Sequence, residues 1–228
     1  MDYTRKQNNM NMTEDKSEHA VLLARFEQED AVYLNQFAAV YGLVGERLQM
    51  PRLLHSLGVA QTAAGLALAF GGDAAKAYLA GLCHDIAKEL PREQQLALVK
   101  RSKLAQDEGV LAHKVLWHAP AGSVLLADLA AVHPELDDAV QNACLWHTLG
   151  KPAMTRLEEI VFIADLIEPG RDFPDLPAIR QAAAQSLTAG VAACMYGAIH
   201  FLEMEGRYIH PLAYEGYNYY KNKLNESN

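Results

Sequence analysis

Residues 81–90 read GLCHDIAKEL, an apolar helical pattern that a His-Asp dipeptide interrupts. The surrounding apolar residues belong in a core, so His84 and Asp85 are expected to lie among them. Burial of two ionisable groups costs several kcal/mol unless a partner compensates. A divalent metal ion is one such partner, because imidazole and carboxylate are ligands that suit it. Taken alone, the dipeptide is explained better by an ordinary core pair in which Asp85 meets a basic residue.

Other polar residues interrupt apolar helical patterns in the same way. Asp165 is the most informative, because it is centred in the apolar run 161–167, where a carboxylate seldom lacks a strong partner. Three histidines have comparable positions: His55, His118 and His147. With His84 and Asp85 they make six side chains that could coordinate one or two transition metals. His113 lies five residues before His118, so the two do not share a helix face. It is therefore kept only as a reserve ligand.

Composition limits the classes of partner. Half of the 228 residues are apolar, enough for one large domain or two small ones with a sizeable core. The formal net charge is −8, whereas a nucleic-acid-binding protein normally has a basic balance, so no nucleic-acid polymer is expected as a partner. Metals and a few basic residues can still supply the local positive charge that a small phosphorylated substrate needs.

The chain is expected to be cytoplasmic and to have no membrane partner. Its three cysteines show no CxxC spacing and are interpreted as reduced core residues. The first 17 residues are polar and Asn-rich, unlike a signal peptide. No apolar run approaches the roughly 20 residues of a transmembrane helix.

The fold class is predicted to be all-α, an irregular helical bundle, because helical periodicity alternates with Pro- and Gly-marked turns and no strand-like alternation is found. We expect a disordered tail over residues 1–17, an N-terminal helical extension over 18–48 and a main domain over 49–224. Within the main domain we expect helices at 52–70, 73–83, 92–103, 110–118, 121–131, 135–148, 156–167, 176–205 and 211–224. Pro51, Asp73 and a capping box from Thr155 to Glu158 mark three of their starts.

The order of His55, the His-Asp pair and Asp165 in an all-helical chain resembles the HD superfamily of metal-dependent phosphohydrolases. Six segments narrow the resemblance: RLLHSLGVA at 52–60, AGLCHDIAKELP at 80–91, HAPAG at 118–122, WHTLGKP at 146–152, ADLIEPGRDFP at 164–174 and IHP at 209–211. Over about residues 50 to 220 the series resembles the YqeK family of bacterial symmetrical diadenosine tetraphosphate hydrolases, which makes residues 49–224 an HD phosphohydrolase domain. The N-terminal extension is longer than the resemblance leads us to expect.

The resemblance implies one or two iron ions, with manganese, cobalt or zinc as alternatives. It implies that the metal ligands are His55, His84, Asp85 and Asp165, with His84 and Asp85 as the catalytic pair. It implies that the substrate contacts are His118, His147, Thr148, Arg171, Tyr208, Ile209, His210, Pro211, Leu212 and Ala213. His118 and His147 occupy positions that bind a second ion in two-metal HD enzymes.

The implied reaction is symmetrical cleavage of diadenosine tetraphosphate into two ADP by attack of a metal-bound water on a bridging phosphate. Arg171 offers a planar guanidinium to the phosphates, although a surface residue in a Pro-rich turn is the alternative. No role is assigned to Lys88. Two other functions stay open: a different HD-type nucleotide phosphohydrolase, and a non-catalytic nucleotide or metal sensor. A homodimer is the assembly we consider.

Overall fold

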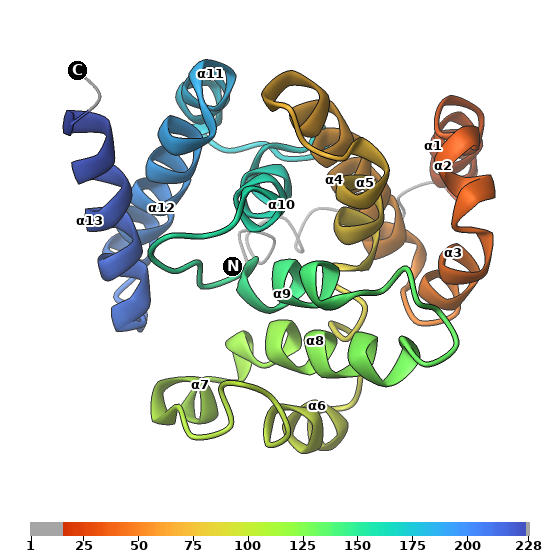
Figure 1. The fold of residues 1–228 in the computed structure, drawn as a ribbon, viewed down its shortest axis with the longest axis horizontal. Helices are drawn as coiled ribbons and strands as arrows, with labels where there is room; N and C mark the ends of the chain where they lie inside the picture. The colour runs from red at the N-terminus through yellow and green to blue at the C-terminus, as the bar shows by residue number, and fades with distance from the viewer. Residues whose placement is uncertain (1–15, 227–228) are drawn as a thin grey trace.

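The computed structural model describes residues 16–226, and this part of the chain is built of helices without a strand, which confirms the all-α prediction (Figure 1). The N-terminal helices are α1 (Lys16–Glu29), α2 (Ala31–Gln36) and α3 (Ala38–Gly45). They are followed by α4 (Met50–Phe70), α5 (Ala74–Cys83), α6 (Arg92–Val99), α7 (Glu108–Ala112), the 3-10 helix η2 (Lys114–Leu116), α8 (His118–Leu129), α9 (Asp138–Trp146), α10 (Arg156–Ile167), α11 (Leu176–Gln185), α12 (Leu187–Met204) and α13 (Pro211–Glu226).

Helices α4 and α5 form the closest pair in the molecule's centre. Helix α4 starts with proline in its first turn and ends at Gly71, whose φ of 75° is left-handed. The carboxylate of Asp73 then caps α5 by accepting a hydrogen bond from the Lys76 N–H at 3.0 Å. The two backbones can meet because a Cβ on Gly81 would lie only 2.8 Å from the Cα of Ala60. This close approach brings His55 on α4 near the His-Asp pair that follows α5.

Helix α10 lies between the α4–α5 pair and the C-terminal helices α11 to α13 (Figure 1). Its predicted capping box is present: the Thr155 hydroxyl accepts from the N–H of Glu158, and the Glu158 carboxylate accepts from the N–H of Thr155. Most of α10 is buried, including Ile160 and Ile163. Asp165, near the end of this helix, is therefore held against α4 and α5.

The N-terminal helices share the core of the main domain. Phe26, Leu34 and Val40 belong to the same buried cluster as Leu57 of α4 and Leu82 of α5. A polar contact reinforces this packing, since the Tyr78 hydroxyl donates to Asp30 at 3.1 Å. Residues 1–15 of the expected tail lie outside the described residues, and its last two residues begin helix α1.

Three helix predictions differ from the structure. The expected single helix at 176–205 is wrong, because Ser186 is extended at φ −166°, ends α11 and caps α12 through its hydroxyl. The helix expected at 92–103 ends at Val99, and the helix expected at 110–118 is replaced by α7 and η2, with α8 beginning at His118. The cysteines agree with the prediction, since Cys83, Cys144 and Cys194 are buried and free.

Helices α4 and α12 are long and apolar enough to cross a membrane by length and composition, which corrects the expectation that no apolar run approaches this length. Half of the apolar window of each helix is buried inside the molecule. Leu57 and Val59 of α4 and Val191 and Cys194 of α12 are fully buried, so both helices serve as core helices of a packed domain.

Candidate metal centre

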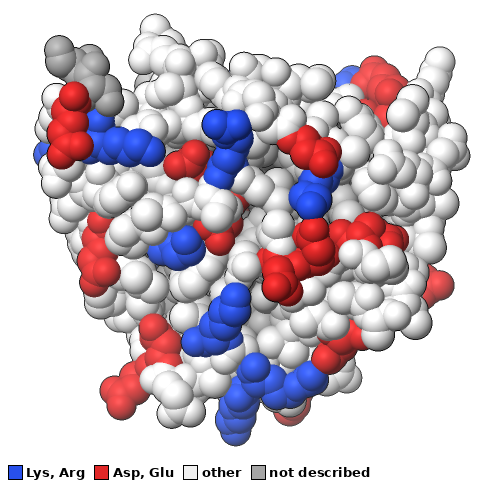
Figure 2. Space-filling view, viewed as in Figure 1, with Lys and Arg blue, Asp and Glu red and all other residues white. Residues whose placement is uncertain are grey.

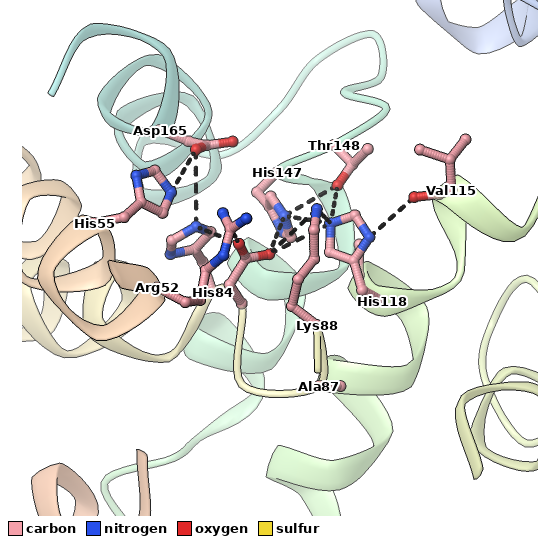
Figure 3. Close-up of polar contacts among 12 residues, drawn as sticks. Arg52, His55, His84, Ala87, Lys88, Val115, His118, His147, Thr148 and Asp165 are labelled. Atoms are coloured by element: carbon pink, nitrogen blue, oxygen red, sulfur yellow. Dashed lines mark hydrogen bonds and ion pairs between the residues drawn. The ribbon is translucent and has the colours of Figure 1, made fainter. Parts of the chain in front are cut away.

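The structure brings the six predicted imidazoles and carboxylates together (Figure 3). His55 comes from α4 and Asp165 from α10, while His84 and Asp85 follow the last residue of α5. His118 is the first residue of α8 and His147 directly follows α9. Three overlapping sets have ligand atoms within 4.8 Å of one another: His55, His84 and Asp85; His84, His147 and Asp165; and Asp85, His118 and His147.

A common device orients three of the histidines. Each has its Nδ1 close to the carbonyl oxygen three residues earlier: His84 to Gly81 at 2.7 Å, His118 to Val115 at 3.0 Å, and His147 to Cys144 at 2.7 Å. Because a carbonyl only accepts, each Nδ1 must carry the proton and donate it. Each Nε2 is then left with a lone pair that faces the centre of the cluster.

His55 is oriented by a carboxylate instead. Its Nδ1 lies 3.1 Å from Oε1 of Glu168, which accepts the hydrogen bond, so its Nε2 also faces the cluster. Glu168 is only 5% exposed and its other oxygen accepts from the N–H of Gly170 at 2.5 Å. Gly58 makes room for this carboxylate, since a Cβ there would lie 2.8 Å from Oε2.

Several of the inward-facing atoms have no hydrogen-bond partner in the protein. Nε2 of His55, Nε2 of His84 and Oδ1 of Asp85 are buried without a hydrogen bond. Nε2 of His118 and Nε2 of His147 lie 3.1 Å apart, although both are acceptors. Buried polar atoms normally have partners, and two lone pairs cannot satisfy each other. One or two divalent cations would satisfy these atoms, so the residues present fit a metal centre.

Asp85 connects two halves of this centre. Its Oδ2 lies 3.5 Å from Nε2 of His84 and accepts from Arg52 at 3.0 Å. Its Oδ1 lies 3.4 Å from Nε2 of His118 and 3.5 Å from Nε2 of His147. The donor set therefore offers one half with His55, His84 and Asp165, and another half with His118 and His147.

The protonation states suit metal binding. Burial lowers the pKa of His84 to about 3 and, together with Lys88, lowers the pKa of His118 well below its usual value. Burial alone would raise the pKa of Asp85, but Lys88 and His84 lower it well below its usual range. The pKa of Asp165 is lowered in the same way, where burial is outweighed by Arg171 and His55. Near neutral pH, His84 and His118 are therefore neutral imidazoles, and Asp85 and Asp165 are ionised carboxylates.

Three basic residues surround the centre. Arg171 donates two hydrogen bonds to Asp165. Nη2 donates to the carboxylate oxygen Oδ1 at 2.5 Å, and Nε donates to the backbone oxygen of Asp165 at 2.8 Å. Arg52 binds Asp85, and the ammonium of Lys88 lies 3.1 Å from Nε2 of His118. Sequence reasoning singled out Arg171, assigned no role to Lys88 and missed Arg52. Their spacing was an available signal, because Arg52 precedes His55 by three residues and Lys88 follows Asp85 by three.

The predicted substrate contacts separate into two groups. The Thr148 hydroxyl lies 2.9 Å from Nε2 of His118 and 3.0 Å from Nε2 of His147, so it belongs to the centre. The segment 208–213 lies against α7, where Tyr208 stacks on His113 with 3.6 Å between ring centroids and His210 binds Asp107 at 3.0 Å. Among residues 16–226, no hydrogen bond or ion pair joins this segment to the six ligands. The reserve ligand His113 belongs to this second group.

Comparisons with known proteins agree with this arrangement. Residues 52–170 match the model of the HD domain. The chain is similar to proteins named symmetrical bis(5'-nucleosyl)-tetraphosphatase, with 34% identity to that of Bacillus subtilis and 35% to that of Halalkalibacterium halodurans, each match covering 77% of this chain and 92% of the relative. A crystal structure from Clostridium acetobutylicum, described as a predicted HD superfamily hydrolase involved in NAD metabolism, matches with a TM-score of 0.74 and 33% identity, covering 82% of this chain and 97% of that one.

Proposed function

This chain belongs to the HD-domain family of symmetrical bis(5'-nucleosyl)-tetraphosphatases, and we propose that it hydrolyses diadenosine tetraphosphate into two ADP at a transition-metal centre. One observation supports this most directly. Four histidines donate their Nδ1 protons outward and turn their Nε2 lone pairs inward, towards two carboxylates. A metal site explains this pattern, whereas an ordinary core would leave these acceptors unsatisfied.

We propose that His55, His84, Asp85 and Asp165 hold one ion and that His118 and His147, with Asp85, hold a second. Iron is the proposed metal, since imidazole and carboxylate together suit it, as they also suit manganese, cobalt or zinc. A bound divalent ion supplies a Lewis acid and lowers the pKa of water, which makes hydrolysis feasible near neutral pH. His84, Asp85 and His147 each take part in two of the three overlapping sets, and we propose the adjacent pair His84 and Asp85 as the central ligands.

The chain's own charges suit a polyphosphate. Lys88 lies on the His118 side of Asp85, and Arg171 lies on the Asp165 side. A tetraphosphate that crosses the centre would therefore meet a positive charge on each side of the cleaved bond. Arg171 binds phosphate oxygens through a planar fork, and Thr148 offers a hydroxyl beside His118 and His147. Water is added across one phosphoanhydride bond, so a central cut yields two ADP and nothing else.

We further propose a small-molecule substrate in the cytoplasm and no nucleic-acid polymer or membrane partner. The three free, buried cysteines support a reducing compartment. Figure 2 shows basic and acidic side chains interspersed on one face of the molecule, which favours a small substrate over a polymer. Residues 49–224 are proposed as the catalytic domain and residues 18–48 as its helical extension. The homodimer stays a prediction, for which light scattering on the purified protein is the measurement.

Product analysis tests the proposed function. The metal-loaded protein should convert diadenosine tetraphosphate into ADP as the sole product, and chelation should stop the reaction. ATP with AMP as products would show an asymmetrical cut. Turnover of nucleoside monophosphates, triphosphates or cyclic nucleotides, with none of diadenosine tetraphosphate, would assign the centre to another HD phosphohydrolase reaction.

A further inference from the structure

An open hollow of about 780 Å³ lies beside the metal centre, between the end of α10 and the start of α11. Its walls include Arg171, Asp172, Phe173, Pro174, Pro177 and Arg180. None of these residues except Arg171 was singled out as a site residue by the sequence. The volume is in the range of roughly 300–1,000 Å³ that is typical of small-molecule sites.

Arg171 joins this hollow to the metal centre. Its guanidinium contacts the Asp165 carboxylate at 2.5 Å, and the same side chain lines the hollow. A phosphate chain that binds at Asp165 and continues past Arg171 therefore leads into the hollow. Glu168 forms a second ion pair with Arg171, with 3.8 Å between Oε1 of Glu168 and Nε of Arg171.

The hollow lies on the opposite side of the centre from His118. In Figure 3 Asp165 and His118 are at opposite ends of the cluster. In Figure 1 α11, which forms part of the hollow, is at the top of the view and α7 is at the bottom, with α9 and α10 between them. A substrate cut at its centre has two equal halves, which must leave the centre in different directions. One half can leave past His118, and the other past Arg171.

The walls suit a nucleoside. Phe173 and the prolines give an apolar surface, and Phe173 is partly buried against the core. Arg180 is held in place because Nε and Nη2 donate to the backbone oxygen of Ile167 and Nη2 also donates to that of Glu168. An immobilised guanidinium and an aromatic ring are both surfaces on which a base stacks. The lining holds two arginines and one aspartate, and of the arginines Arg171 is paired with Asp165.

We propose that this hollow binds the adenosine of one half of the dinucleotide, with its base on Phe173. The inference rests on the proposed function, because it takes the substrate to be diadenosine tetraphosphate. It assigns residues 171–180 a role in selecting a substrate that carries a nucleoside on the Arg171 side.

Phe173→Ala in the metal-loaded enzyme tests the proposal. We expect kcat/KM for diadenosine tetraphosphate to fall about five- to one-hundredfold, as expected when one base loses its stacking partner. Inorganic tetraphosphate, which has no adenosine, should inhibit the variant and the wild type competitively with the same inhibition constant. Phe173→Tyr keeps the ring and should restore the wild-type kcat/KM. Tyr196→Ala, which removes an exposed aromatic ring on α12 outside the hollow, is the matched control.

The possible results distinguish a failure of the adenosine site from a failure of the proposed hydrolase function. An unchanged kcat/KM in Phe173→Ala overturns the adenosine site while leaving the hydrolase intact. An inhibition constant for tetraphosphate that rises by the same factor also overturns it, because the defect would then lie at the phosphates or the metal. A wild-type enzyme that forms no ADP from diadenosine tetraphosphate overturns the proposed function, and this inference with it.

Discussion

Glu168 accepts a hydrogen bond from Nδ1 of His55 at 3.1 Å, across 113 residues of sequence. The contact joins the end of α10 to the first turns of α4, and it decides which nitrogen of His55 faces the centre. Carboxylates that orient metal-binding histidines in this way contribute substantially to metal affinity. A change at Glu168 would therefore alter the orientation of His55 while leaving the imidazole itself in place.

Glu168→Ala should weaken metal binding by about 10- to 100-fold. Glu168→Gln should weaken it less, because its amide oxygen can still accept from Nδ1 of His55, although its amide nitrogen cannot accept from the N–H of Gly170. Titration of the metal-free protein with the ion is the measurement. Gly58→Ala provides a second route, since its Cβ would displace the same carboxylate without changing its chemistry. Wild-type affinity in Glu168→Ala would show that His55 is oriented by other contacts.

His84→Ala or Asp85→Ala should abolish both bound metal and hydrolysis, because these two residues belong to overlapping ligand sets. Elemental analysis of the purified variants, paired with an ADP assay, measures both effects. His113→Ala is the control: its ring stacks on Tyr208, away from the six ligands, so the metal content should stay at the wild-type level. Hydrolysis that survives either of the first two changes would refute the site assignment.

Metal affinity should rise with pH and then level off. Burial lowers the pKa of His55, but the neighbouring carboxylates of Asp165 and Glu168 outweigh burial and raise that pKa above the usual value of about 6.5 in the metal-free protein. Below the raised pKa an incoming ion must displace a proton from His55, so affinity should fall about tenfold per pH unit there. His84, whose pKa is lowered to about 3, should add nothing in this range.

Calorimetric metal titrations in buffers of different ionisation enthalpy measure this proton directly. We expect release of about one proton at pH values below the raised pKa of His55 and a decline towards zero above it. Proton release that does not change between about pH 5.5 and about pH 8.5 would contradict the assignment of the proton to His55.

Tyr220→Phe should lower the free energy of unfolding by about 1–3 kcal/mol. The fully buried hydroxyl donates to Glu159 at 2.9 Å and accepts from the N–H of Met154 at 3.1 Å, so its removal leaves two buried groups without a partner. Urea denaturation measures the change. Tyr214→Phe removes a hydroxyl from a 40% exposed tyrosine and should change stability by no more than about 0.5 kcal/mol. Equal effects of the two substitutions would contradict the argument.

Sequence reasoning singled out the candidate ligands because each left a local mark. A histidine or aspartate in an apolar helical pattern is visible without knowledge of its neighbours, and His55, His84 and Asp165 all have this mark. The all-α fold was predictable for the same reason, since helical periodicity and capping residues such as Asp73 and Thr155 act locally.

What sequence reasoning missed depends on contacts between distant segments. Glu168 lies in the segment 164–174 without a role assigned from the sequence, and only its position against His55 gives it one. The sequence around Ser186 is Ala-rich and does not reveal that the helix ends there. The break depends on the packing of α11 against α12. A Cβ on Gly190 would lie 3.0 Å from the Cα of Ala183, a closeness that no local pattern encodes.

The shared core of helices α1 to α3 with α4 and α5 bears on how the chain is made. Synthesis releases the N-terminal helices first, but Phe26, Leu34 and Val40 have their buried partners in segments translated later. These apolar faces stay uncovered on the ribosome until Leu57 and Leu82 have emerged. The core around α4 and α5, against which the candidate metal centre is built, is therefore complete only when α1 to α3 pack against helices that are translated after them.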